Sequence, residues 1–361
     1  MSTLFYLLIA LLLLGILITI HEFGHFITAR LCGIAVREYA IGMGPKLISR
    51  TSKKTGTVFS LRALPLGGFC SFYGEDDIEG KEQEDPRAFG KAAVWKRMLT
   101  VLMGPGMNFL LAFLVLFLWF AIGGVQTATE VQPFIISVDA EGPAAESGLQ
   151  EGDLLLRVNG ETASGASLDG VMGLITAWKE GDAPLALDVQ RGDEELTLKM
   201  TPFYDEELGR YRVGVTLGGR VIGTERTAVS IGDALRYSWD NCVYAGGTIL
   251  RALRALVTTG EGLDQTSGPI GVVSLVSEEV RAGGFEAFLN LLVVISINLG
   301  IMNLLPIPGL DGSRFLFLVL EAIRRKPLPA KREAMVNMVG MALLLALMVF
   351  FTYKDIAKLL Q

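Results

Sequence analysis

Residues 3–25 read TLFYLLIALLLLGILITIHEFGH, an apolar run that ends in two histidines and a glutamate. No charged side chain stands between Ser2 and His21, and no lysine or arginine appears before Arg30. A helix of this length, at about 1.5 Å per residue, is long enough to cross a hydrocarbon core of ~30 Å. Because no basic segment precedes the run and no small-residue cleavage site closes it, a retained membrane helix over about residues 4–29 is favoured over a signal peptide.

Three further runs, over residues 98–129, 287–310 and 334–353, lack charged side chains. They predict spans over about residues 98–125, 287–323 and 334–353. The 361 residues are 51% hydrophobic and 19% charged, with a mean hydropathy of +0.45, which is too apolar for an ordinary soluble domain. A formal net charge of −6 without a repeated basic cluster excludes nucleic acid as an expected partner. We therefore predict a polytopic α-helical protein with four transmembrane helices in a lipid bilayer.

The basic residues predict the orientation, because short loops rich in lysine and arginine stay in the cytoplasm. The segment 30–97 holds 12 basic against 8 acidic residues, and the loop 324–333 holds 5 basic residues against 1 acidic residue. The long connection 126–286 holds 12 basic against 25 acidic residues. We expect this connection and both termini to lie outside the cytoplasm.

The outer connection contains a domain. Short alternating strands, a hairpin turn at Asn159-Gly160 and a helix over 167–178 with Ser167 as its N-cap resemble a PDZ domain over about residues 131–203. This α+β fold offers a sheet edge to an extended peptide or a chain terminus. A rigid spacer that binds nothing is the alternative, because a fold alone does not establish a function.

Two other segments flank the predicted spans. Residues 204–286 are interpreted as an extracytoplasmic linker with an amphipathic helix over about 228–260 on the membrane surface, because its apolar residues recur at helical spacing with Arg251 and Arg254 opposite. A fifth span is the alternative, and the charged residues within the segment argue against it. Residues 36–73 predict a β-hairpin on the cytoplasmic side that dips into the bilayer, where protein or a water-filled cavity must cover it. The membrane part thus consists of an N-terminal half, 1–130, and a C-terminal half, 287–361.

His21-Glu22-Phe23-Gly24-His25 is an HExxH motif near the end of the first span, and it contains both histidines of the chain. Histidines four residues apart lie on one face of a helix and can share one Zn²⁺. Glu22 is placed to take a proton from a zinc-bound water and pass it to a leaving amine. Ionisable residues at membrane depth are costly, which favours function over a polar patch at the helix end.

A third protein ligand is expected, since two histidines and a water leave tetrahedral zinc one ligand short. Asp311 is the outstanding acid near the spans, and the topology places it at the depth of His21. Pro306 and Pro308 just before it break the helix and free backbone groups that can face a cavity. Asn303 is a candidate to bind an oxyanion or the substrate backbone, with an interhelical hydrogen bond as the equal alternative.

The segment Gly104-Pro105-Gly106-Met107-Asn108 opens the second span, where small residues let helices approach closely. Asn108 is expected to be a packing residue or to support a metal ligand, and packing is favoured.

Together these motifs resemble the site-2 protease family of intramembrane metalloproteases, and most of all its bacterial RseP-type branch. HEFGH and NLLPIPGLDG match the two catalytic motifs of that family, and GPGMN, IGMGP…LPLGGF and SGPIG are similar as well. The resemblance implies one zinc ion per chain, held by His21, His25 and Asp311, with Glu22 as catalytic base. It implies that the re-entrant hairpin binds the substrate as an added strand, which makes Gly67 and Gly68 candidate substrate-binding residues.

The implied activity is a zinc metalloendopeptidase of the bacterial inner membrane, with its active site toward the cytoplasm. Its expected substrates are the transmembrane segments of single-span proteins such as anti-sigma factors, cut after a first protease, or remnant signal peptides. Many RseP-type proteins carry two tandem PDZ domains, whereas one is legible here. The alternatives are a non-catalytic PDZ scaffold with a structural zinc site and a metal transporter. The complete HExxH argues against the scaffold, and the absence of internal repeats or further polar rings argues against the transporter.

Overall fold

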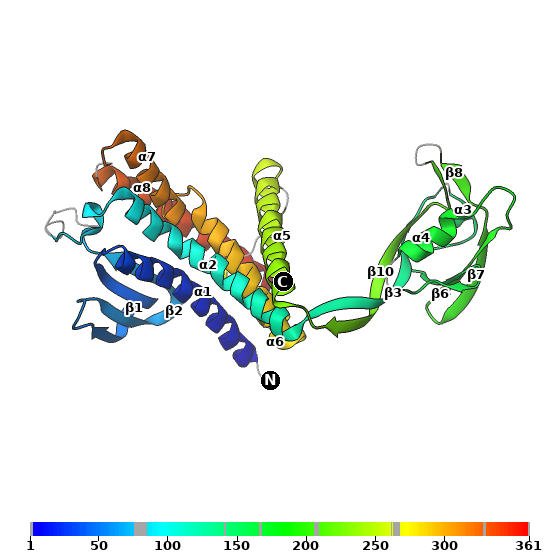
Figure 1. Cartoon of the computed structure of the whole chain (residues 1–361), viewed down its shortest axis with the longest axis horizontal. Coiled ribbons are helices and arrows are strands. Elements are labelled where there is room, and N and C mark those ends of the chain that lie inside the picture. The colour runs from blue at the N-terminus through cyan, green and yellow to red at the C-terminus, as the bar shows by residue number, and fades with distance from the viewer. Residues whose placement is uncertain are drawn as a thin grey trace. The chain divides into compact units, whose positions relative to one another are not determined.

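The computed structural model describes residues 3–75, 85–140, 142–165, 168–205, 209–260, 262, 268–327 and 330–359. The chain forms two compact units, and each is described by itself (Figure 1). The helical unit contains Met1–Trp119 and Ile231–Gln361, and the inserted PDZ-like domain contains Phe120–Ser230.

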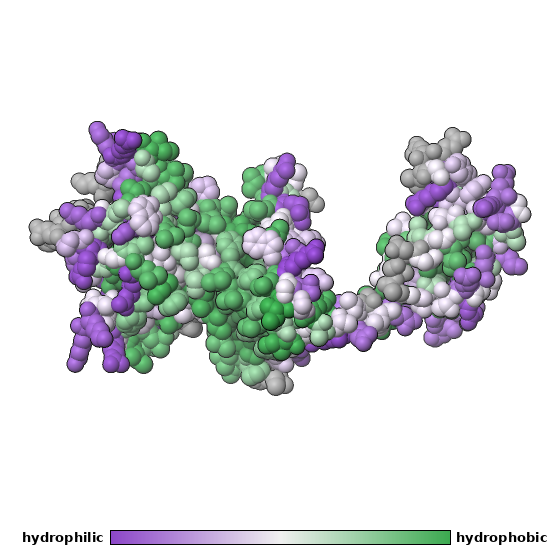
Figure 2. Space-filling view, in the orientation of Figure 1, coloured by the Kyte–Doolittle hydropathy of each residue, from purple (hydrophilic) through white to green (hydrophobic). Residues whose placement is uncertain are grey.

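The longer helices of the helical unit are α1 (Thr3–Leu31), α2 (Val94–Gly123), α5 (Ile231–Thr258), α6 (Pro269–Leu304), α7 (Asp311–Arg324) and α8 (Ala330–Leu359). A short 3₁₀ turn, η2 (Phe89–Lys91), precedes α2. In the described part of the chain, α1, α2, α6 and α8 are long and apolar enough to cross a bilayer, which confirms the four predicted spans. Apolar residues cover these helices in Figure 2, and hydrophilic residues gather at the end near the β1–β2 hairpin and α7.

The centre of the helical unit is an apolar contact between α1, α2 and α6. Leu13 and Leu17 of α1 are buried against Val276 and Val280 of α6, with partly buried residues of α2 beside them. A second cluster packs α5 against α6 around Ile297. The bundle therefore holds α1, which carries the HExxH motif, between two other long helices.

The third predicted span differs from the structure in its bounds. The expectation was a linker up to residue 286 and a span over 287–323, but α6 already begins at Pro269. Glu286 ends the charge-free run in the sequence, whereas α6 also includes residues 269–283, of which Val276 and Val280 are buried against α1. Gly284, with φ of 61°, interrupts the helix, and the segment 305–310 separates α6 from α7.

The N-terminus of α6 is bound by a carboxylate from another helix. Asp355 of α8, which is 8% exposed, accepts hydrogen bonds from the backbone amides of Gly268 (3.1 Å) and Gly271 (2.8 Å). These amides are free donors because no turn of helix precedes them, and the negative charge also suits the positive end of the helix dipole. The contact joins the GPIG segment, whose Ser267 lies outside the described residues, to the last span.

The predicted hairpin is present as β1 (Val36–Thr51) and β2 (Val58–Phe72), which pair antiparallel. The pairing is doubled, because residues 38–41 are partners of both 68–71 and 58–61. Residues 68–71 thus form one border of this small sheet, and no strand of the described chain pairs with their far edge.

Side chains hold the hairpin together and hold it to α1. Glu38, only 9% exposed, accepts hydrogen bonds from Ser60 Oγ (2.6 Å), Lys46 Nζ (3.0 Å) and Arg62 (2.9 Å). The hydroxyl of Tyr39 donates to the carbonyl of Thr19 on α1 (3.0 Å), and Phe26 of α1 packs in the same cluster as Tyr39. The hairpin is therefore positioned directly beside the HExxH turn.

The PDZ-like domain is built on a six-stranded sheet in the order β10-β3-β4-β6-β7, with β5 beside β4. The strands are β3 (Val125–Val138), β4 (Leu154–Val158), β5 (Glu161–Thr162), β6 (Leu185–Arg191), β7 (Glu194–Met200) and β10 (Val215–Thr227). The helices α3 (Pro143–Glu146) and α4 (Asp169–Thr176) and a separate ribbon of β8 (Phe203–Asp205) and β9 (Arg210–Arg212) complete it.

The structure of this domain can be compared with what the sequence predicted for its turn, its last strand and its helix. Asn159 and Gly160 both adopt positive φ, 51° and 84°, as the predicted two-residue hairpin turn requires. β10 was assigned to the linker, but it pairs with β3 along its whole length, so the sheet extends beyond residue 203. The predicted helix 167–178 is α4, and its proposed N-cap Ser167 lies outside the described residues.

One buried ion pair supports the PDZ-like domain. Asp153 is 1% exposed and accepts two hydrogen bonds from Arg191, at 2.8 and 2.7 Å, and one from the Gln150 amide at 2.9 Å. Burial alone raises the pKa of Asp153, but the hydrogen bonds from Arg191 and Gln150 outweigh it and hold the pKa below its usual value.

We expect Asp153→Asn to lower the free energy of unfolding of this domain by about 1–3 kcal/mol at neutral pH, because Arg191 loses its charged partner. A depressed folded-state pKa stabilises fully above the ordinary pKa of ~3.9 and loses that contribution as the pH falls through the folded value. The difference between wild type and variant should therefore close in acid. Urea-dependent proteolysis of the full chain measures it. Glu195→Gln, at an exposed pair with Arg157, is the control and should cost under ~1 kcal/mol.

Candidate metal centre and active site

Three side chains from the two halves of the membrane part meet at one point. His21 and His25 lie one turn apart on α1, and their Nε2 atoms are 3.3 Å apart. Oδ2 of Asp311, the first residue of α7, lies 3.1 Å from His21 Nε2 and 3.2 Å from His25 Nε2. Both histidines are 7% exposed, so their imidazoles are buried, while the Asp311 side chain is 17% exposed.

This donor set fits a zinc ion. Two imidazole nitrogens and a carboxylate oxygen all present lone pairs to the same point, where only a cation or a proton relieves their repulsion. Ligands held at about 2.0–2.2 Å in tetrahedral geometry lie roughly 3.3–3.5 Å from one another, close to the three distances observed. Two histidines and one carboxylate leave a fourth position for water or substrate, as in catalytic rather than structural zinc sites.

The outer ring nitrogens of both histidines have partners on α2. His25 Nδ1 lies 2.9 Å from the carbonyl oxygen of Thr100, so it carries the proton and leaves Nε2 free to bind a metal. The side-chain amide of Asn108 lies 3.2 Å from His21 Nδ1, while its own Oδ1 is buried and lacks a hydrogen-bond partner in the described chain. Turning this amide by 180° lets Oδ1 accept the Nδ1 proton, which gives His21 the tautomer that binds metal through Nε2.

Asn108 is thus in contact with a candidate ligand, although packing was the favoured interpretation of the sequence. It is fully buried, and its backbone carbonyl accepts a hydrogen bond from Ser296 of α6 at 2.8 Å. The sequence offered the signal that an amide stands in a charge-free span, where a polar group needs a partner.

Two glycines let α1 and α2 meet at the metal centre. A Cβ at Gly24, inside the HExxH motif, would overlap the backbone carbonyl of Met103. A Cβ at Gly104 would overlap the imidazole of His25. The close approach that the small residues predicted is therefore required at these two positions, and it brings the Thr100 carbonyl within reach of His25.

A cavity of about 380 Å³ opens onto the cluster. Its lining includes every predicted site residue except Asn108, namely His21, Glu22, His25, Gly67, Gly68, Asn303 and Asp311. Cys70 of β2 and Arg314 of α7 also line it and were not predicted. Arg314 stands one turn after Asp311, so a helix beginning at the aspartate was the signal that would have found it.

Glu22 lies between the metal centre and the hairpin. It is half-buried and lines the same cavity as Cys70 on the border segment of β2. A Cβ at Gly68 would come within 3.4 Å of Glu22 Cγ. The glutamate therefore borders both the metal ligands and the exposed edge of the sheet.

The model of peptidase family M50 matches residues 9–347 of the chain, a range that includes both histidines and Asp311. The chain belongs to this family. This M50 peptidase is 33% identical to a putative zinc metalloprotease of Agrobacterium fabrum over 97% of the chain and 95% of that protein. It is 31% identical to the regulator of sigma-W protease RasP of Bacillus subtilis over 96% of the chain and 97% of that protein. It is also 26% identical to the PDZ domain of an SdrC-like protein from Listeria monocytogenes, over 24% of the chain and 85% of that structure, with a TM-score of 0.21.

Family membership and the four apolar helices make this M50 peptidase a multi-pass membrane zinc metalloprotease. The predicted family and enzyme class are confirmed. His21, His25 and Asp311 form the candidate metal site within it, and the individual roles of the site residues are taken up below.

We expect Gly104→Ala to abolish zinc binding by the full chain, because its methyl group would displace the His25 ring. Gly106→Ala is the matched control from the same segment, since its Cβ would approach no closer than 3.4 Å to the flexible Met103 side chain. Zinc content after purification in detergent measures the difference. Full zinc occupancy in Gly104→Ala would contradict the position of His25.

Proposed function

We propose that this M50 peptidase cleaves peptide bonds within the transmembrane segments of single-span membrane proteins. The observation that carries the proposal is the metal centre itself, which lies between apolar helices and opens, together with Glu22, onto one cavity. A hydrolytic site of this kind meets a substrate that also resides among apolar helices.

The residues of the cavity have distinct roles in the proposed hydrolysis. His21, His25 and Asp311 would hold a zinc ion, which would supply Lewis-acid polarisation of the scissile carbonyl and of the attacking water. Glu22 takes the proton of the attacking water and delivers it to the leaving nitrogen. Asn108 and the Thr100 carbonyl keep the two imidazoles in the tautomer that binds metal.

The border segment of the hairpin is proposed to hold the substrate as an added strand. Residues 68–71 have an unpaired edge, and Gly67 and Gly68 line the catalytic cavity. A transmembrane helix must be unwound before its backbone can be cut, and a free strand edge binds the exposed amides and carbonyls. Non-helical backbone at membrane depth is tolerated only where protein or a cavity covers its polar groups. The hairpin lines this cavity, which supports its re-entrant placement.

Asn303, near the end of α6, is proposed to donate to the substrate carbonyl or backbone. It lines the cavity, and its side chain has no hydrogen-bond partner among the described residues. That observation favours the substrate role over the interhelical hydrogen bond that the sequence left as an alternative.

The cellular role is proposed to be the second cut of regulated intramembrane proteolysis. One relative is named as the regulator of sigma-W protease, which supports anti-sigma factors as a substrate class, and remnant signal peptides are a second class. The distribution of basic loops supports a metal centre that faces the cytoplasm and a PDZ-like domain on the outer side. β10 is an outer strand of that domain, so a peptide or chain terminus has a sheet edge to join.

Glu22→Gln should keep zinc and lose cleavage by a factor of at least about 10³, because the amide cannot accept the proton of the water. The assay uses the purified full chain in liposomes with a tagged single-span protein that has a short outer tail. A zinc chelator should abolish wild-type cleavage. If Glu22→Gln cleaved at the wild-type rate, the proposed mechanism would be wrong, and zinc-loaded wild type that cuts no such substrate would favour the scaffold.

Gly67→Ala should reduce cleavage of that substrate about 5- to 30-fold with zinc retained, because Gly67 adopts φ of 83° and a side chain there costs about 1–2 kcal/mol. The loss should appear mainly in KM. Gly56→Ala is the matched control, since it has φ of 75° in the turn of the same hairpin and does not line the cavity. Equal losses in both variants would remove the border segment from substrate binding.

A further inference from the structure

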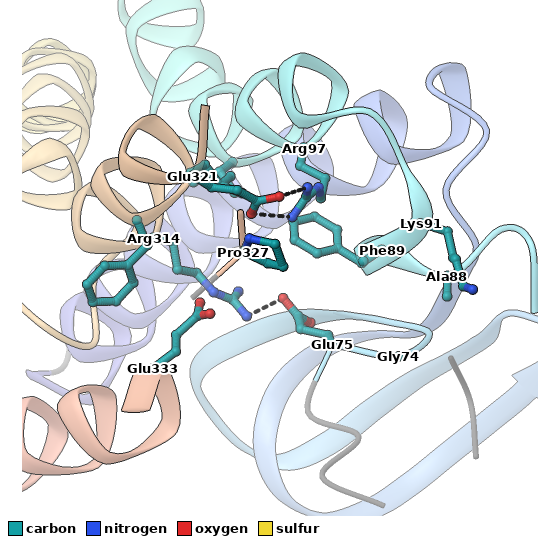
Figure 3. A pocket seen from close by; sticks show the side chains of 14 residues that line it. Gly74, Glu75, Ala88, Phe89, Lys91, Arg97, Arg314, Glu321, Pro327 and Glu333 are labelled. Atoms are coloured by element: carbon teal, nitrogen blue, oxygen red, sulfur yellow. Dashed lines mark hydrogen bonds and ion pairs between the residues drawn. The ribbon is translucent and has the colours of Figure 1, made fainter. Parts of the chain in front are cut away.

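A buried ion pair joins α2 to α7 beside a second cavity of about 330 Å³ (Figure 3). Arg97 donates two hydrogen bonds to the carboxylate of Glu321, at 3.0 and 2.6 Å, and both side chains are at most 14% exposed. The fork of a guanidinium matches both oxygens of a carboxylate, which fixes distance and orientation together. We call this contact the Arg97–Glu321 clamp.

The guanidinium of Arg97 is also held by contacts other than the one with Glu321. Its Nε donates to the carbonyl of Ala92 at 3.0 Å, and it lies 6.0 Å from the centre of the Phe89 ring. These two contacts restrict the Arg97 side chain, so little further conformational entropy is lost when it binds the Glu321 carboxylate. This distinguishes the clamp from exposed ion pairs, which contribute little because two long side chains must be ordered in water.

On its first side the clamp is attached to the helix that orients both imidazoles. Arg97 stands one turn before Thr100, whose carbonyl accepts the Nδ1 proton of His25. Asn108, two turns further along α2, contacts His21. A shift of α2 along its axis would therefore move the partners of both histidines at once.

On its second side the clamp is attached to the helix that begins with the third ligand. Glu321 lies ten residues after Asp311 on α7, a rigid distance of about 15 Å. The irregular segment 305–310, with two prolines, links α7 to α6 and leaves the helix free to pivot unless another contact holds it. A second ion pair, between Arg314 and Glu75 after β2, lies on the same side of α7 (Figure 3).

We propose that the Arg97–Glu321 clamp sets the position of Asp311 relative to His21 and His25 and so determines the affinity for zinc. Arg97 and Glu321 are positioning residues, since neither lines the catalytic cavity. The two histidines and the aspartate come from segments nearly 300 residues apart in sequence, and covalent connection does not set the distance between them. The inference rests on the zinc site proposed above.

The test measures zinc affinity of the full chain in detergent by competition with a chromophoric chelator, and melting temperatures of the zinc-free and zinc-loaded forms. Arg97→Lys keeps the charge but loses the fork, and Glu321→Gln keeps the shape but loses the charge. The matched control is Arg191→Lys, which weakens the equally bidentate pair with Asp153 in the PDZ-like domain. The double variant Arg97→Lys with Glu321→Gln tests whether the two residues act through one contact.

Both single variants should bind zinc at least about tenfold more weakly, as changes around metal ligands commonly do, and Arg191→Lys should bind it as wild type does. Their zinc-free forms should melt somewhat below the wild-type temperature, because a buried ion pair is weakened, and the rise in melting temperature on zinc binding should be smaller than in wild type. The double variant should lose no more affinity than the worse single variant.

Unchanged zinc affinity would overturn the clamp, and so would additive losses in the double variant. An equal fall in the melting temperatures of both forms, with zinc affinity preserved, would make the pair a general structural contact and overturn the inference as well. A wild-type chain without zinc affinity would contradict the proposed metal site itself, which separates failure of the function from failure of the clamp.

Discussion

His21 Nε2, His25 Nε2 and Asp311 Oδ2 lie within 3.1–3.3 Å of one another inside an apolar helical unit. Most of the other polar contacts around them serve to hold these three atoms in place. Uncompensated, such a cluster is costly, because neither water nor lipid relieves the repulsion of its lone pairs. A divalent cation relieves it only if all three atoms are placed to a few tenths of an ångström. Gly24 and Gly104 let α1 and α2 approach closely, and the Asn108 amide orients His21, so these residues help to place the three atoms.

Hydrolysis adds a second requirement, which is that water and the backbone of a peptide reach this centre. Regular helices offer neither, since all their backbone groups are paired internally. Two irregular features adjoin the metal ligands: the hairpin with its unpaired border and the break between α6 and α7. Both line the same cavity, so polar backbone is exposed only where substrate or water can pair with it.

The sequence predicts those features that local residue types make energetically evident, such as polar side chains in an apolar span or residues that favour one turn conformation. Two histidines and an aspartate at membrane depth are rare enough to indicate ligands, and Asn159-Gly160 specifies its turn by backbone conformation alone. The parts that local pattern misses depend on distant partners. The acidic residues Glu278, Glu279 and Glu286 obscured the first part of α6, because local composition does not reveal its burial against α1. β10 appeared to be linker until its pairing with β3 was known, and nothing near Arg97 points to Glu321.

The inserted domain raises the question of how two halves of one active site stay together across more than a hundred intervening residues. The register of its outer strands supplies the answer. β3 enters the domain and β10 leaves it, and the two pair antiparallel from Val138 with Val215 to Val125 with Thr227. The ends of the insertion are therefore neighbours, so the domain imposes no separation on the helices before and after it. Because closing a loop costs little more as the loop grows, the halves can then be joined by their own contacts, through Asp311, Ser296 and the Arg97–Glu321 clamp.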